Sequence, residues 1–130
     1  MDEIFARNVL YWGDEAQKII ASSHIAVFGL GGVGGFCAEA LARSGVGELT
    51  LVDFDKVSKS NINRQIIALN STVGMYKTEL FEIRLRDINP DIKLHLINDF
   101  YLEDFDFSGI NYTADAIDTM RSKVNLLVKC

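Results

Sequence analysis

IAVFGLGGVG, at residues 25–34, is the stretch that decides the fold of this chain. Its β-branched and aromatic start predicts a short strand, after which a turn without bulky side chains leads into a helix. In such a turn Gly29 allows the tight bend, Gly31 and its neighbour Gly32 let the backbone approach a phosphate, and Gly34 permits close packing of helix on strand. The helix N-terminus attracts an anion through its free N–H groups and its dipole. A merely flexible loop is the alternative, but the order strand, turn and helix favours a phosphate-binding turn.

The next elements complete a βαβ unit. The helix after the turn ends at Ser44-Gly45 and carries an apolar stripe that we expect to lie on the sheet, made of Val33, Phe36, Cys37, Ala40 and Leu41. The second strand, Glu48–Val52, leads into Asp53, which follows Gly29 at roughly the 20-residue spacing of an acidic side chain that holds a ribose hydroxyl. These residues predict a nucleotide-binding unit without saying which nucleotide binds.

Composition limits the possible classes of protein. The chain has 130 residues, of which 48% are hydrophobic and 24% charged, as expected for one globular domain. It contains no apolar run long enough for a membrane span and no signal peptide at its start. Its net charge of −5 argues against broad, nonspecific binding of nucleic acid. Cys37 and Cys130 form neither a disulfide framework nor a metal cluster, which fits a reducing, cytoplasmic location.

Two further helices are predicted from capping and apolar spacing. Asp14 and Gln17 have the spacing of a capping box, and the apolar residues around them form a helical stripe: Trp12, Ala16, Ile19 and Ile20. A stronger helix runs over residues 75–88 and is ended by Asn89-Pro90. Its broad apolar face comprises Tyr76, Leu80, Phe81, Ile83, Leu85 and Ile88.

The remaining pattern predicts an α/β fold with a Rossmann-like parallel sheet and flanking helices. Residues 92–96 alternate apolar and polar side chains, as in a half-exposed edge strand. Residues 112–117 are predicted to form a buried strand beside the first, and residues 120–128 a helix. The acidic and aromatic segment 98–111 has no clear pattern and stays unassigned.

The candidate chemistry lies after the glycine turn. A long polar segment begins at Asp55 and leads to Arg64, and Lys77 opens the next helix. Two cations near a phosphate-binding turn suit a triphosphate, and Asp118, after the last strand, is placed to hold magnesium against those phosphates. Each of these three residues also has a purely structural interpretation. Arg64 could form a surface ion pair, Lys77 could be a solvated helix residue, and Asp118 could cap a helix. Their common place at one sheet edge favours the functional interpretation.

The chain resembles the ubiquitin-activating-enzyme-like adenylyltransferases, which include the activators of the thiamine and molybdopterin sulfur carriers. The matching motifs are GLGGVG, LVDFD, NINRQ, VGMYK and DAID. Within that family, ALARSGVGELTLVDFD and NINRQIIAL resemble the tRNA-modifying branch that dehydrates threonylcarbamoyladenosine (t6A37) in ANN-decoding tRNA. This resemblance implies ATP and Mg²⁺ as cofactors, tRNA as substrate, and a homodimer. It covers nearly the whole chain but only about the first half of the family's adenylation domain, so residues 1–130 are expected to be an ATP-binding part that is inactive alone.

The resemblance also assigns roles. It implies Asp53 on the ribose, Arg64 and Lys77 on the triphosphate, and Asp118 on magnesium. It further implies that Arg7 reaches the phosphates bound by the neighbouring subunit and that Asn61 lines the same pocket, in the polar segment that starts at Asp55. A substrate carboxylate would attack the α-phosphorus of ATP, and ring closure of the acyl-adenylate would release AMP.

Three other interpretations stay open at this point. A sulfur-carrier adenylyltransferase, working with a sulfur-carrier protein or a cysteine desulfurase, would share the ATP residues. A nicotinamide dehydrogenase would share the glycine turn and Asp53 but gives no reason for Arg64, Lys77 and Asp118 together. A noncatalytic nucleotide-binding or dimerising module is the third.

Overall fold

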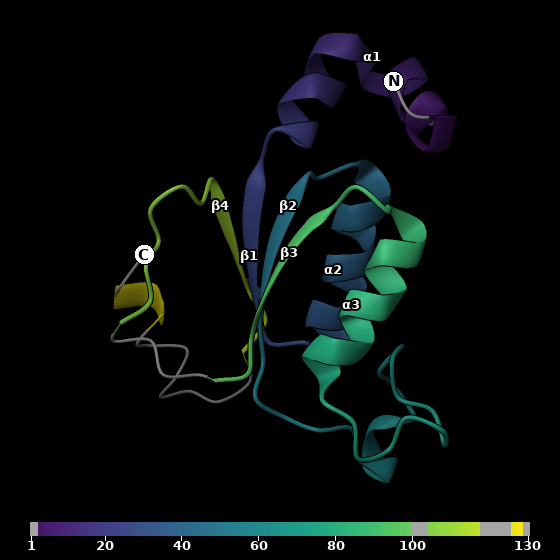
Figure 1. The fold of residues 1–130 in the computed structure, drawn as a ribbon, viewed down its shortest axis with the longest axis vertical. Helices are drawn as coiled ribbons and strands as arrows, with labels where there is room; N and C mark the ends of the chain where they lie inside the picture. Colours follow the sequence, from purple (N-terminus) through teal and green to yellow (C-terminus); the bar gives the residue numbers. More distant parts are fainter. Residues whose placement is uncertain (1–2, 100–103, 118–125, 129–130) are drawn as a thin grey trace.

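A four-stranded parallel sheet forms the centre of the molecule in the computed structural model, which describes residues 3–99, 104–117 and 126–128 (Figure 1). The elements follow one another as η1 Glu3–Phe5, α1 Ala6–Ala21, β1 His24–Phe28, α2 Gly32–Ser44, β2 Glu48–Val52, η2 Lys59–Asn61, α3 Lys77–Ile88, β3 Lys93–Ile97 and β4 Tyr112–Asp115. This alternation of strands and helices confirms the predicted Rossmann-like α/β fold.

The strand order β3-β2-β1-β4 places β1 and β2 at the centre of the sheet. β1 pairs with β2 from His24–Glu48 to Phe28–Val52, and β4 pairs with the other side of β1. The prediction that the last strand lies beside the first is therefore confirmed, as is the half-exposed edge position of β3. All four strands run in parallel, so their carboxyl ends meet at one edge, where ligands bind in open α/β sheets.

Two apolar clusters cover the two faces of the sheet. On one face α2 and α3 pack over a core that includes Leu49, Leu51, Phe81 and Leu85 (Figure 1). On the other face Phe28 contacts Phe105 and Phe107, with ring centroids 5.0 and 5.9 Å away. Phe105 and Phe107 belong to the segment that showed no pattern in the sequence, and they help to bury the face of β1 that α2 and α3 do not cover.

The predicted apolar stripe of α2 was wrong. Its members Val33 and Phe36 are 76% and 53% exposed, whereas the residues buried against the sheet are small: Gly34, Gly35, Ala38 and Ala42. Small side chains let the helix axis come close to β1, and larger ones would hold the two elements apart. The helix is therefore turned by about one residue from the face that hydrophobicity alone selects.

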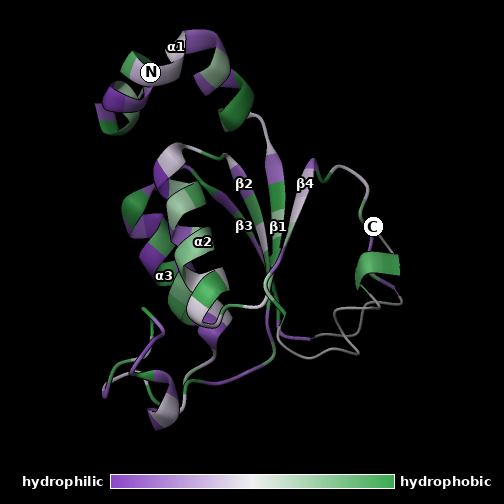
Figure 2. Cartoon of the chain, turned by 180° about the vertical axis from the view of Figure 1, so that it is seen from behind, coloured by the Kyte–Doolittle hydropathy of each residue, from purple (hydrophilic) through white to green (hydrophobic). Residues whose placement is uncertain are grey.

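Other helix predictions need smaller corrections. α1 begins at Ala6, ahead of the predicted start, and Gly13 (φ 82°) interrupts it, so the capping-box spacing at Asp14 marks the second half of the helix. On α3, whose apolar and polar residues alternate in Figure 2, Ile83 is 65% exposed and lies outside the buried face. α3 ends at Ile88 with Asn89 as its cap, as predicted from Asn89-Pro90.

The last predicted strand is shorter and less buried than expected. β4 ends at Asp115, and Tyr112 at its start is 75% exposed because β4 is an edge of the described sheet. The helix predicted over residues 120–128 falls mostly outside the described residues.

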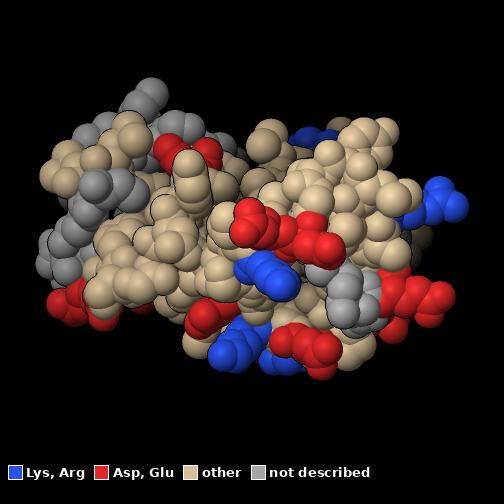
Figure 3. Space-filling view, turned by 90° about the horizontal axis from the view of Figure 1, so that it is seen from above, with Lys and Arg blue, Asp and Glu red and all other residues tan. Residues whose placement is uncertain are grey.

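The described surface is mixed in charge. Figure 3, seen from above onto the α1 end, shows acidic and basic side chains interspersed, and neither sign forms a continuous patch on the part of this face that the structure describes. Within residues 3–99, 104–117 and 126–128, none of the helices is long and apolar enough to cross a lipid bilayer.

Candidate nucleotide-binding site

A hollow of about 360 Å³ opens at the carboxyl ends of β1 and β2, beside the residues that follow β4. It lies where a ligand is expected in a sheet of this topology. The residues that line it are Gly29, Gly31, Gly32, Val33, Asp53, Asp55, Asn61, Arg64, Gln65, Lys77, Ala116 and Ile117.

The glycine turn forms one wall of the hollow. Gly29 has φ 92° and donates its N–H to the carbonyl of Val52 (2.8 Å). A Cβ at Gly29 would lie 2.6 Å from the carbonyl oxygen of Ala116, and a Cβ at Gly34 would lie 1.6 Å from that of Gly29. Gly34 therefore supports the turn from behind and does not line the hollow. Gly31 precedes α2 without a side-chain cap, so the first N–H groups of α2 are open to an anion.

Asp53 ties the turn to the end of β2. The residue is 3% exposed; Oδ2 accepts the N–H of Leu30 and Oδ1 that of Asp55, each at 2.7 Å. Burial raises the pKa of Asp53, while the hydrogen bonds from these two amides oppose that change. Each oxygen keeps a second lone pair. The assignment of Asp53 to a ribose hydroxyl stays a prediction, but its structural role is clear from these contacts.

Replacing Asp53 by alanine should lower the free energy of unfolding by about 2–3 kcal/mol, because two buried N–H groups lose their acceptor. The stability of Asp53→Asn should lie between those of the wild type and Asp53→Ala, since the one side-chain oxygen of asparagine can accept only part of these hydrogen bonds. Urea denaturation measures the loss, with the exposed Asp91→Ala, expected to change stability by less than about 0.5 kcal/mol, as control. An Asp53→Ala protein as stable as the wild type would contradict the structural role of Asp53 as acceptor for Leu30 and Asp55.

Lys77 brings a buried cation to the hollow. It is 4% exposed at the first position of α3, and its Nζ lies 3.9 Å from Oδ2 of Asp55, whose side chain is 52% exposed. A largely buried lysine is costly unless its ammonium is well paired, and among the described residues the 3.9 Å contact with Asp55 is a long one. The arrangement suits an anionic ligand that enters between Lys77 and the glycine turn.

Arg64 and Asn61 come from the polar segment before α3. The Nη1 of Arg64 donates to the carbonyl of Ser60 and to Oδ1 of Asn63, both at 2.9 Å, which directs its exposed guanidinium. Asn61 is 9% exposed and its Oδ1 accepts the N–H of Ser58 at 2.9 Å. This capping arrangement shapes the short helix η2, so the segment forms a defined wall of the hollow.

Gln65 is a lining residue that the sequence did not single out. It is 7% exposed, and among the described residues its buried Oε1 has no hydrogen-bond partner. Leaving a buried oxygen without a partner costs about 1–3 kcal/mol, and native proteins contain few such groups, so Oε1 is available to a ligand or a water molecule in the hollow. The available signal was its place directly after Arg64 in the polar run N-I-N-R-Q.

The structure brings eight of the predicted site residues together at the hollow and places two others, Gly34 and Arg7, away from it. Gly29, Gly31, Gly32, Asp53, Asp55, Asn61, Arg64 and Lys77 line it. Gly34 lies behind the turn, and Arg7 is exposed on α1 and does not line the hollow. Asp118 lies outside the described residues, although Ile117, which precedes it, is at the hollow.

In the part of the chain that the structure describes, no cysteine lines the hollow. Cys37 lies on α2 and does not line the hollow, and burial raises the pKa of its thiol. A thiol with a raised pKa is a poor nucleophile at neutral pH.

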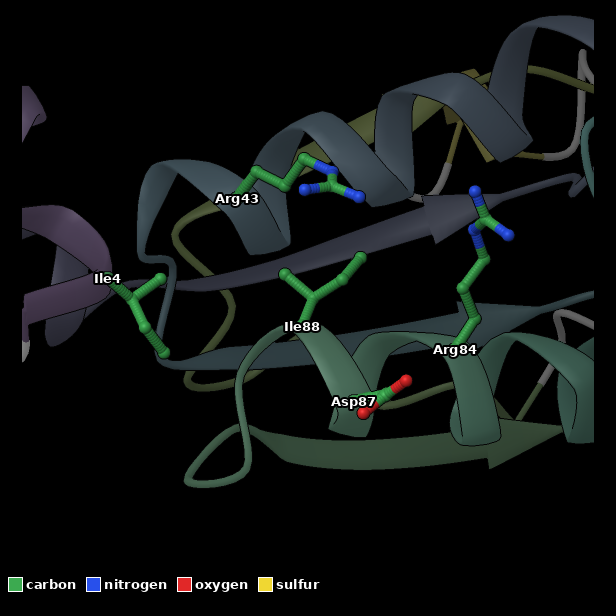
Figure 4. A pocket seen from close by; sticks show the side chains of 5 residues that line it. All are labelled: Ile4, Arg43, Arg84, Asp87 and Ile88. Carbon is green, nitrogen blue, oxygen red and sulfur yellow. The ribbon is translucent and has the colours of Figure 1, made fainter.

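A second hollow, of about 460 Å³, lies between α2 and α3 near η1 (Figure 4). Arg43 and Arg84 point into it from the two helices. Both guanidinium groups pair with Glu39, Arg84 Nε at 2.6 Å and Arg43 Nη2 at 3.6 Å from Oε1. Both cations therefore already share a partly buried carboxylate, and the ion pair of Glu39 with Arg84 links α2 to α3. We assign no ligand to this hollow.

The fold and the hollow define a Rossmann-like α/β protein with a glycine-rich turn at the carboxyl edge of its sheet. The model of the ThiF family matches residues 5–130, and the chain belongs to this family.

Its relatives include the tRNA threonylcarbamoyladenosine dehydratase of Bacillus subtilis, 47% identical over 97% of this chain and 51% of the relative. The molybdopterin-synthase adenylyltransferase of Haemophilus influenzae is 41% identical over 74% of this chain and 38% of its own length. Among solved structures, the E. coli tRNA N6-threonylcarbamoyladenosine dehydratase in complex with ATP matches with a TM-score of 0.94 at 39% identity, over 98% of this chain and 54% of that chain. The chain therefore spans about half the length of the curated relatives it matches.

Proposed function

We propose that this chain forms the ATP-binding part of an adenylating enzyme that acts on the threonyl carboxylate of threonylcarbamoyladenosine in tRNA. Lys77, nearly buried beside the glycine turn, carries the proposal, because an ammonium whose ion-pair partner among the described residues is a carboxylate 3.9 Å away favours an anionic ligand in the hollow. The 47% identity to a tRNA threonylcarbamoyladenosine dehydratase supports the choice of substrate.

We assign each group of residues that lines the hollow to one part of the nucleotide. The N–H groups at the start of α2 and the cations of Arg64 and Lys77 hold the triphosphate. Asp53 faces the ribose with its free lone pairs, and Asp55 and Asn61 complete the nucleotide contacts. Gly34 keeps the turn at the distance from β1 that these contacts need.

The proposed reaction begins when the substrate carboxylate attacks the α-phosphorus and pyrophosphate leaves. The substrate's own ureido group then attacks the acyl carbon of the adenylate and gives up one proton, the bond from that carbon to the oxygen on phosphorus breaks, and AMP departs with that oxygen. Arg64 and Lys77 stabilise the charge that develops on the leaving pyrophosphate, and the rigid turn fixes the α-phosphate in line with the attack.

Magnesium is part of the proposal through Asp118. Asp53 is proposed to face the ribose, and Asp55 pairs with Lys77 at 3.9 Å, so we assign magnesium to a further carboxylate. Asp118 follows Ile117, which lines the hollow, and a carboxylate there suits a hard cation. Bound magnesium would supply positive charge against the phosphates.

We further propose a cytoplasmic homodimer in which Arg7 reaches the nucleotide of the neighbouring subunit. Arg7 is exposed on α1 and does not line the hollow of its own chain, as this arrangement requires. A sulfur-carrier protein or a cysteine desulfurase is the other partner class that the resemblance suggests.

Isothermal titration calorimetry with ATP and magnesium should show binding to this chain, whereas NAD should give no measurable heat. The reason is that Arg64 and Lys77 offer two cations beyond the glycine turn, more than the pyrophosphate of a dinucleotide needs. Tight binding of NAD without binding of ATP would overturn the proposal in favour of a dehydrogenase.

The rival substrate is a sulfur-carrier protein, which the molybdopterin-synthase relative favours. ATP–pyrophosphate exchange by the intact protein, measured once with tRNA that contains threonylcarbamoyladenosine and once with a sulfur-carrier protein, separates the two. Exchange stimulated by tRNA alone supports the dehydratase, and exchange stimulated only by the carrier would replace it. No exchange with either, despite ATP binding, would support a noncatalytic module.

A further inference from the structure

The chain has two histidines, and the fold brings both of them to one carboxylate. His24 opens β1, Glu48 opens β2, and His95 is the third residue of β3. All three are on the sheet face opposite α2 and α3, since the alternate residues of these strands pack under the helices. Parallel pairing places His24 level with Glu48 and His95 level with Thr50. A rigid, hydrogen-bonded sheet therefore sets the spacing of the three side chains.

The donor atoms of the three residues converge. One ligand atom from each of His24, Glu48 and His95 lies within 4.8 Å of the others. Oε2 of Glu48 is 2.6 Å from Nε2 of His95 and 3.7 Å from Nδ1 of His24. Metal bonds of about 2.0–2.2 Å in tetrahedral zinc sites separate neighbouring donor atoms by about 3.4 Å. Small side-chain rotations bring these three atoms to that spacing.

Hydrogen bonding orients His24 for such a role. Its Nε2 is 2.6 Å from the hydroxyl of Thr50, which is 4% exposed, so Thr50 holds the ring and leaves Nδ1 facing Glu48. The 3.7 Å from Nδ1 to Oε2 is too long for a hydrogen bond, and the space between them suits a cation. A second hydrogen bond on the far nitrogen is the usual support of a metal-binding histidine.

We propose that His24, Glu48 and His95 form a binding site for a divalent transition-metal ion of the zinc class. Two imidazoles and one carboxylate are a donor set that zinc, cobalt and nickel favour over magnesium or calcium. Bound metal would clamp β1, β2 and β3 together on the face that α2 and α3 leave uncovered.

There is room beside these residues for the remaining coordination positions. The three side chains border a hollow of about 520 Å³, which Asp104, Asp106 and Ser108 also line. The side chains of His24, Glu48 and His95 are 15%, 32% and 52% exposed, so an ion can reach them from solvent. Water or an added ligand can complete the coordination there.

The metal site is separate from the nucleotide site. His24 is at the amino end of β1, and the glycine turn follows its carboxyl end, about 17 Å away for a five-residue strand. None of its three residues lines the hollow around Asp53 and Lys77. Zinc binding here therefore does not depend on the proposed ATP-dependent reaction, and either can fail without the other.

The test uses a Cys37→Ser, Cys130→Ser background, in which thiolates cannot contribute ligands. Zn²⁺ titration by calorimetry should show one site per chain, and Co²⁺ should give a visible absorption band. Glu48→Gln and His95→Gln should each weaken binding at least about 100-fold, and Thr50→Val about 10-fold. Lys93→Gln, on the same face and in register with Glu48, is the matched control and should not weaken binding.

A second measurement needs no substitution of the proposed metal-binding residues. The chain has only two histidines, so the imidazole NMR signals of the wild type report directly on the site. Both should shift with Zn²⁺ and broaden with paramagnetic Co²⁺. Absence of binding, unchanged imidazole signals, or equal affinity in the folded Glu48→Gln and His95→Gln variants would overturn the proposal.

Discussion

Replacing Gly34 by alanine is expected to lower the free energy of unfolding by at least about 3 kcal/mol, a large part of the stability of a domain this size. The added Cβ would lie 1.6 Å from the carbonyl oxygen of Gly29 and 3.1 Å from Cβ of Ala116. The oxygen belongs to the backbone of the turn, so the clash is relieved only if α2 moves away from β1. Thermal unfolding followed by circular dichroism should show a transition lowered by about 10 °C or more.

Gly32→Ala is the matched control for this variant. A Cβ at Gly32 would make ordinary contact with the side chain of Arg64 at 3.7 Å, and Gly32 does not have a positive φ. Its stability should change by less than about 1 kcal/mol, while a methyl group in the hollow should weaken ATP binding. If Gly34→Ala were as stable as Gly32→Ala, the close packing of α2 on the turn would not be needed.

The sheet could be predicted because its signals are local. The strand at residues 25–28, the glycine turn, the alternation at residues 92–96 and Asn89-Pro90 each give one element or boundary, and parallel connections leave few strand orders. The same locality made much of the candidate site predictable, because residues that follow parallel strands meet at one edge. Gly29 and Asp53, which directly follow β1 and β2, line the hollow for this reason, whereas Asn61 was assigned through the resemblance to the family.

What the sequence did not reveal depends on packing between distant segments. The buried face of α2 follows the space available against β1, which favours Gly34 and Ala38 over the larger Val33 and Phe36. Phe105 and Phe107 follow no period because they cover Phe28 from a loop. Gln65 is distinguished only by an oxygen without a partner among the described residues. These features arise from three-dimensional contacts, which hydrophobic periodicity does not encode.

Replacing Lys77 by methionine should have opposite effects on ligand binding and on stability. The affinity for ATP should fall by about 3 kcal/mol, on the order of 100-fold, because the phosphates lose a buried cation. The free energy of unfolding should stay equal or rise, because methionine fills the space of the lysine stem without a buried charge. Asp55 is half-exposed, so its carboxylate regains water when its partner is removed.

Lys56→Met provides the control, since Lys56 is exposed, lies over the ring of Tyr76 and does not line the hollow. Its ATP affinity should change by less than about threefold at physiological salt, where a cation outside the site is largely screened. Calorimetric ATP titration and urea denaturation of both variants give the comparison. A Lys77→Met protein that is strongly destabilised but binds ATP normally would mean that Lys77 supports the fold through Asp55. The combination of weaker binding with undiminished stability is the result that identifies Lys77 as a ligand-binding residue, because a purely structural lysine cannot produce it.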